Sequence, residues 1–211
     1  YANTTGTQNV AVGSSAGDAM TTANNNVTVG HGSLSANTTG SSNVAVGAFA
    51  LKLNTTATGN TALGNNTLGA NTTGASNVAV GSLALDANTT ASNNTAVGYT
   101  ALGANTTGYE NVAVGISALA QNTTGLGNTA IGRVALTAST TASNNTAVGT
   151  VSLYSNTTGT SNSALGAYAL QQNSNASNNT AVGYTALTAN TTGASNTALG
   201  YAALGASTTA S

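Results

Sequence analysis

The sequence predicts an all-β protein, a parallel β-solenoid (β-roll or β-helix) built from twelve 17-residue coils. An Asn-x-[Ala/Thr]-[Val/Leu/Ile]-Gly block begins at Asn9 and returns every 17 residues to Asn196, without insertion or deletion. Such a short, fixed period is typical of units that stack on their neighbours and cannot fold alone. Proline is absent, as a continuous backbone ladder requires. Glycine, asparagine and threonine recur in every period, which disfavours helix.

The first predicted element of each coil is a short strand. We number the coils from Asn9 and the 17 positions of each coil from its Asn. Position 3 is Ala except at Thr28, and position 4 is always Val, Leu or Ile. This alternation of β-forming residues predicts a strand, with position 4 as a buried column. The Gly at position 5 then permits a bend with positive φ.

The second predicted element is another short strand around positions 8 and 9. Position 9 is Leu from Leu34 to Leu204, and Gly17 alone interrupts it. We expect this leucine column to be buried as well. Positions 12 to 14 read Asn-Thr-Thr in most coils, which supplies the turn that returns the chain to the next coil.

A second period is superimposed on the first. Position 15 alternates between Gly and Ala from Gly6 to Ala210, and the phase slips once, between Gly108 and Gly125. Tandem duplication of a 34-residue ancestor and the use of two alternating turn types both predict this pattern, and the two explanations are compatible.

The thinness of one coil predicts self-association. Ordering 17 residues costs backbone entropy in every coil, whereas each coil offers only two large apolar side chains to bury. Several chains that share a core of Ala, Val and Leu would bury more surface. We therefore expect a homotrimer, intertwined or side by side.

Composition excludes several function classes. The charged residues are Lys52 and Arg133 against Asp18, Asp86 and Glu110. Two basic residues cannot supply the phosphate contacts of a nucleic-acid-binding protein, and no apolar run approaches the roughly 20 residues that span a bilayer. Cysteine is absent, so there is no disulfide framework. The chain opens with Tyr1 rather than Met. We expect residues 1–211 to form a single repeat-array domain, a fragment of a longer fibrous protein.

No catalytic, cofactor-binding or metal-binding residues are predicted. His31 has no second ligand at metal-binding spacing, and one histidine without loop insertions does not suggest a Ser-His-Asp site. Asp18 and Asp86 are four coils apart, about 19 Å at about 4.8 Å per coil, which is too far for a carboxylate pair. The chain is therefore not expected to be an enzyme or to use a cofactor.

Two sets of surface residues are candidates for binding. Tyr99, Tyr184 and Tyr201 share the variable position 6, and exposed tyrosine rings can stack on sugars. The Thr pairs at positions 13 and 14 form columns along the repeat. They predict either hydroxyls that bridge successive coils or an ice-binding ladder. Because adjacent strand residues point to opposite faces, bridging is the preferred interpretation.

The blocks resemble two known groups of fibrous proteins. Residues 94–102, followed by the Asn-Thr-Thr-Gly at 105–108, resemble the head repeats of trimeric autotransporter adhesins and, more closely, the arrays of phage tail-fibre-type proteins. The shared Asn-x-Ala-[Val/Ile/Leu]-Gly core recurs in all twelve coils with one change, Thr28 in place of Ala, although adhesin repeats are commonly shorter. The resemblance implies a trimeric left-handed β-roll or β-helix on a virion surface, or at an extracellular or cell-surface location. It also implies a structural fibre segment for attachment or spacing, with a host-surface glycan or protein as partner. The alternative function is an ice-binding solenoid.

Overall fold

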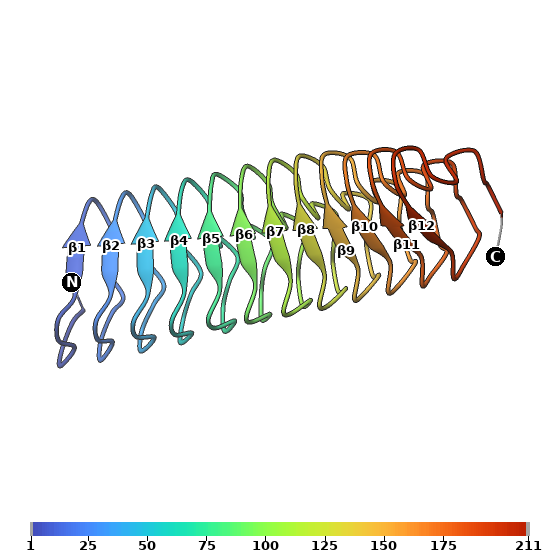
Figure 1. Cartoon of the computed structure of the whole chain (residues 1–211). Coiled ribbons are helices and arrows are strands. Elements are labelled where there is room, and N and C mark those ends of the chain that lie inside the picture. Colours follow the sequence, from blue (N-terminus) through green and yellow to red (C-terminus); the bar gives the residue numbers. More distant parts are fainter. Residues whose placement is uncertain (1, 210–211) are drawn as a thin grey trace. The chain divides into compact units, whose positions relative to one another are not determined.

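The computed structural model describes residues 2–209, so Tyr1, Ala210 and Ser211 lie outside the described residues. The chain forms two compact units, Tyr1–Thr107 and Gly108–Ser211. The first contains β1 (Val10–Val12), β2 (Val27–Val29), β3 (Val44–Val46), β4 (Thr61–Leu63), β5 (Val78–Val80) and β6 (Thr95–Val97). The second contains β7 (Val112–Val114), β8 (Thr129–Ile131), β9 (Thr146–Val148), β10 (Ser163–Leu165), β11 (Thr180–Val182) and β12 (Thr197–Leu199). The labelled strands can be followed in Figure 1.

Within each unit, every strand pairs in parallel with the strand of the next coil. The register offset is 17 residues, as in Val10↔Val27 in the first unit and Thr180↔Thr197 in the second. Each strand has three residues, and the described residues contain no helix. The prediction of an all-β parallel solenoid with one 17-residue coil per repeat is confirmed.

The strands turn position 3 inward and positions 2 and 4 outward. Ala45 and Ala96 are fully buried, whereas Val12 is 56% exposed and Leu165 is 49% exposed. The prediction that position 4 forms a buried column is therefore wrong for the single chain. Side chains alternate along a strand, and the Asn at position 1 and the Ala at position 3 already occupy the interior. The leucine column at position 9 is buried as predicted from Leu34 to Leu187.

The second predicted strand does not form. Positions 6 to 11 make a turn, in which positions 7 and 9 have positive φ, as at Thr100 (52°) and Leu102 (51°). These left-handed residues break the extended backbone that a strand needs. The leucine enters the core from a bend. The bend at position 5 is confirmed, since Gly81 has φ +124° and an added Cβ would lie 2.7 Å from the carbonyl oxygen of the next coil's Gly98.

Buried asparagine side chains join successive coils along two columns. The backbone N–H of Asn43 donates to Oδ1 of Asn26 at 2.9 Å, and its Nδ2 donates to the carbonyl of Ala57 at 2.9 Å. From position 12, Asn54 Nδ2 donates to Asn37 Oδ1 at 3.0 Å and to the same Ala57 carbonyl at 3.2 Å. Both columns thus satisfy a backbone carbonyl that the coil leaves unpaired in its interior, and so avoid the cost of burying unpaired polar groups.

The two threonine columns have different roles. At position 13, Thr21 Oγ1 donates to the carbonyl of Thr38 at 3.1 Å, and Thr38 Oγ1 donates to that of Thr55 at 3.2 Å. At position 14, Thr22 and Thr39 are exposed. The prediction of hydroxyls that bridge successive coils is confirmed for position 13, and only one threonine of each pair faces outward.

The alternation at position 15 leaves the turn backbone unchanged, since position 17 has positive φ in Gly coils and in Ala coils alike, as at Ser76 (58°) and Asn93 (62°). In Gly coils the backbone N–H at position 16 donates to a serine of the following Ala coil, as from Ala75 to Ser92 Oγ (2.9 Å) and from Thr160 to Ser177 Oγ (2.9 Å). An added Cβ at Gly74 would lie 2.2 Å from the carbonyl oxygen of Ala91. The glycine coils therefore need glycine because the next coil approaches too closely for a side chain.

Replacing Ser139 by asparagine should stabilise the chain. Ser139 stands at position 12, where most coils have Asn, and its Oγ is buried without a hydrogen-bond partner. The introduced asparagine would accept a hydrogen bond from Asn156 Nδ2 and donate to the carbonyl of Ala142, as its counterparts in other coils do. We expect the free energy of unfolding to rise by about 1 kcal/mol, measured by urea denaturation with an unchanged m-value. Thr141→Asn is the matched control, because position 14 is exposed and already carries Asn175; it should change stability by less than about 0.5 kcal/mol. An equal effect of both changes would contradict the ladder.

Candidate functional site

Each unit presents an apolar face along its strands. The outward side chains at positions 2 and 4 include exposed Val10, Val12, Val44, Leu63 and Val78 in the first unit, and Ile131, Leu165 and Leu199 in the second. No charged residue occupies either position in any coil. Position 2 is Val in five coils and Thr or Ser in the other seven, so position 4 is the column that is apolar in every coil. Exposed apolar surface of this kind is typical of an interaction site.

The sequence analysis predicted that the position-4 side chains of this face form a buried column. The sequence feature that indicates the outward orientation of positions 2 and 4 is the small residue at position 3, which lies between them. Position 3 is Ala in eleven of the twelve coils, and a small, unvarying residue fits a crowded interior better than Val, Leu and Ile in turn.

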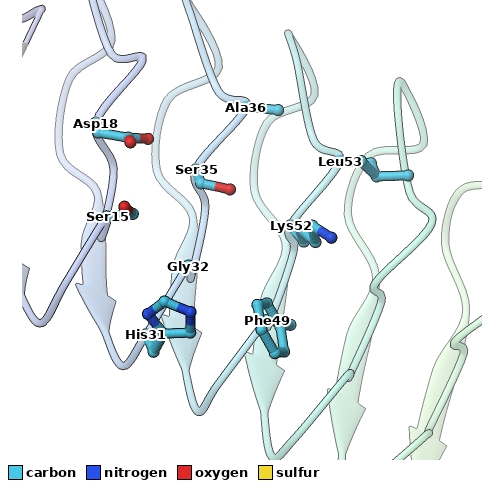
Figure 2. Close-up of a pocket in the computed structure, with 9 residues that line it drawn as sticks. All are labelled: Ser15, Asp18, His31, Gly32, Ser35, Ala36, Phe49, Lys52 and Leu53. Carbon is cyan, nitrogen blue, oxygen red and sulfur yellow. The ribbon is translucent and has the colours of Figure 1, made fainter.

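A shallow groove crosses coils 1 to 3 of the first unit (Figure 2). It has a volume of about 480 Å³. Its walls come from the turn that follows each strand, and Figure 2 shows that its side chains project from three successive coils. The lining residues are Ser15, Asp18, His31, Gly32, Ser35, Ala36, Phe49, Lys52 and Leu53.

The Phe49 ring contacts two other side chains of this groove. The His31 ring meets Phe49 edge-on, with centroids 5.1 Å apart and an interplanar angle of 76°. Lys52 Nζ lies 5.2 Å from the Phe49 centroid, within the range of a cation–π interaction. His31 is exposed, and its ring contacts Phe49 rather than a second metal-binding side chain.

A second depression continues the first toward coils 4 and 5. It shares Phe49, Lys52 and Leu53 and adds Asn66 and Asp86. Asp86 is half-buried, and this burial raises the pKa of its carboxyl group above the usual value, because the charged form loses hydration. We call the two depressions together the coil 1–5 groove.

The three predicted tyrosines are divided between the two units. Tyr99 belongs to the first unit and is exposed. In the second unit, Tyr184 and Tyr201 stack with centroids 5.6 Å apart at 14°, and Tyr168 meets Tyr184 edge-on at 5.8 Å. The structure thus brings two of the predicted residues together and adds Tyr168. Tyr184 is 49% exposed and Tyr201 is 81% exposed, and their contact with a sugar stays a prediction.

Two common kinds of functional element are missing from the described part of the chain. Within residues 2–209, no three His, Cys, Asp or Glu side chains gather where they could hold a metal ion. The same residues contain no helix long and apolar enough to cross a membrane.

Comparisons of this chain with protein-family profiles, with curated protein sequences and with solved structures find no match.

Replacing Asp86 by asparagine should remove a pH dependence of stability. Because its pKa is raised in the folded chain, the folded state binds more protons than the unfolded state between the two pKa values. The free energy of unfolding should therefore fall as pH rises from about 3.9, the ordinary aspartate value, through the higher folded pKa. Urea denaturation between about pH 3 and 7 should show this fall in the parent but not in Asp86→Asn. Asp18→Asn, at the same coil position, should keep the slope. A parental slope in Asp86→Asn would contradict the assignment.

Proposed function

We propose that this chain is a non-enzymatic structural fibre segment that mediates attachment or spacing, on a virion surface or at an extracellular or cell-surface location. A phage tail-fibre-like protein is the first candidate and a bacterial surface adhesin the second. The observation that carries the proposal is the regular stack of coils in each unit, with an apolar column along its outward face. Such a stack suits reach and assembly better than catalysis.

Assembly with further copies of this chain is part of the proposal. The outward Val, Leu and Ile side chains recur at every coil with the same 17-residue period. Parallel copies aligned in whole-coil register would therefore meet at every coil, with apolar surface against apolar surface. No charge interrupts positions 2 and 4, so no desolvation penalty for charged groups opposes the contact. A homotrimer would enclose these columns around a common axis and leave the turns free to contact a host-surface glycan or protein.

Ice binding is the second candidate function. It is favoured by the exposed threonines at position 14, which recur once per coil, as at Thr39, Thr56 and Thr73. The neighbouring column turns inward, because the position-13 hydroxyls bond to the next coil. A single outward column offers a narrower array than two, which ranks this function below the fibre.

Charged substitutions on the apolar face should dissociate the assembly. The parent chain should sediment as three copies of the 20.1 kDa protomer at micromolar concentration. Val46→Glu combined with Val80→Glu should sediment as a folded monomer, because these half-buried strand residues face outward and a carboxylate would be desolvated at the contact. Thr39→Glu combined with Thr73→Glu adds the same charge at exposed position 14 and should leave the trimer intact.

A parent chain that sediments as a stable monomer would contradict the assembly. The ice-binding candidate would then be tested by thermal hysteresis of the same sample at micromolar concentration. For the fibre we expect no hysteresis and no shaping of ice crystals.

A further inference from the structure

The coil 1–5 groove gathers most of the chain's Lys, Arg, Asp, Glu and His side chains. The sequence contains six Lys, Arg, Asp, Glu and His residues in all. Four of them, Asp18, His31, Lys52 and Asp86, line the groove, together with the chain's single phenylalanine. Other coils fold with residues such as Ser, Thr, Gly, Tyr or Gln at the equivalent positions 6, 7 and 10. The solenoid itself therefore does not require this cluster.

The interior residues of coils 1 and 2, beneath the groove, also differ from those of the other coils. In coil 1, Gly17 replaces the position-9 leucine and Met20 replaces the position-12 asparagine; in coil 2, Thr28 replaces the position-3 alanine. An added Cβ at Gly17 would lie 2.3 Å from Met20 Cε and 3.1 Å from Thr28 Cγ2. The methionine and threonine thus fill the space that leucine occupies elsewhere, and Met20 is only 3% exposed. The departures from the repeat leave a packed interior under the groove.

We propose that the coil 1–5 groove binds a neutral oligosaccharide whose chain runs along the stack of coils. This inference deepens the proposed attachment function and rests on it, because it names the ligand class and the surface that contacts it.

The alternation of charge along the groove favours a neutral, hydroxyl-rich ligand. Asp18, Lys52 and Asp86 all stand at position 10, two coils apart, about 9.6 Å at about 4.8 Å per coil. A polyanion would meet two carboxylates, and a polycation would meet the ammonium group. Hydroxyl groups suit both, because each can donate to a carboxylate and accept from an ammonium group. A hydroxyl that donates to the half-buried Asp86 carboxylate would also replace hydration that burial removes.

The shape and apolar surface of the groove favour a chain over a single enclosed sugar. The groove is shallow and open, and it continues from coil 1 to coil 5 through the shared residues Phe49, Lys52 and Leu53. The Phe49 ring and the Leu53 side chain supply apolar contacts for the C–H faces of pyranose rings. Gly32 stands at position 7 of coil 2, between Ser15 in coil 1 and Phe49 in coil 3. Because it has no side chain, it does not fill the groove at this point.

The test is titration calorimetry of the full 211-residue chain with neutral hexasaccharides of β-1,4-linked glucose, mannose and N-acetylglucosamine, and with hexagalacturonate as the acidic comparator. We expect at least one neutral hexasaccharide to bind. The triple variant His31→Ser, Phe49→Ser, Lys52→Thr should weaken that binding at least tenfold. Its substitutes already occur at the same coil positions, as Ser14, Ser15 and Thr137, so the fold should be kept. Arg133→Ser and Tyr154→Thr, the matched changes at positions 6 and 10 of the second unit, should leave binding unchanged.

Three results would overturn the proposal. They are no binding of any neutral hexasaccharide, undiminished binding by the triple variant, or tighter binding of hexagalacturonate that is lost with Lys52→Thr alone. Sedimentation of the triple variant separates this inference from the proposed fibre function. A variant that assembles like the parent but loses the saccharide isolates the groove, whereas a parent that fails to assemble counts against the fibre and leaves the saccharide titration interpretable.

Discussion

The structure depends on coil-to-coil hydrogen bonding at a constant offset of 17 residues. Backbone amides along the strand and both turns pair with the equivalent region of the adjacent coil, and the buried Asn amides follow the same spacing. A single inserted residue would shift every later side chain out of register with its neighbours. This constraint accounts for a repeat without insertions. It also accounts for the absence of proline, because proline has no backbone N–H to donate to the adjacent coil.

The same constraint makes the interior narrow. Opposite walls of a coil are joined by Asn side chains from positions 1 and 12 that meet at one carbonyl, so the space between them holds small side chains, mostly Ala, and one Leu in most coils. The larger strand residues are left outside. A single chain therefore exposes Val, Leu and Ile side chains that a globular domain would bury, and the energetic argument for association follows from the geometry of the ladder.

Charged and aromatic side chains gather at positions whose side chains the ladder does not use. Positions 6, 7 and 10 carry nearly every charged and aromatic side chain, because their side chains leave the coil at the turn while their backbones keep the pairing. These positions therefore carry most of the side chains that could recognise a ligand by charge or by ring stacking. The first unit uses them for a mixed-charge groove around Phe49, whereas the second uses them for a tyrosine cluster. Two similar scaffolds thus carry different surfaces.

The sequence by itself determined the fold class, the coil length, the strand at positions 2 to 4 and the buried leucine column, because periodicity and residue type report directly on stacking. Only the tertiary structure decided which way the strand faces. A three-residue strand alternates over too few residues to indicate which of its sides is buried. Asparagine is also common in turns, so the sequence did not indicate that the Asn at position 1 is buried in the core. The sequence also did not predict the left-handed turn that replaces the second strand. Nor did it predict the contacts of His31 and Lys52 with Phe49. Both depend on how side chains from separate coils pack, and residues that far apart in the sequence leave no local signal of their contact.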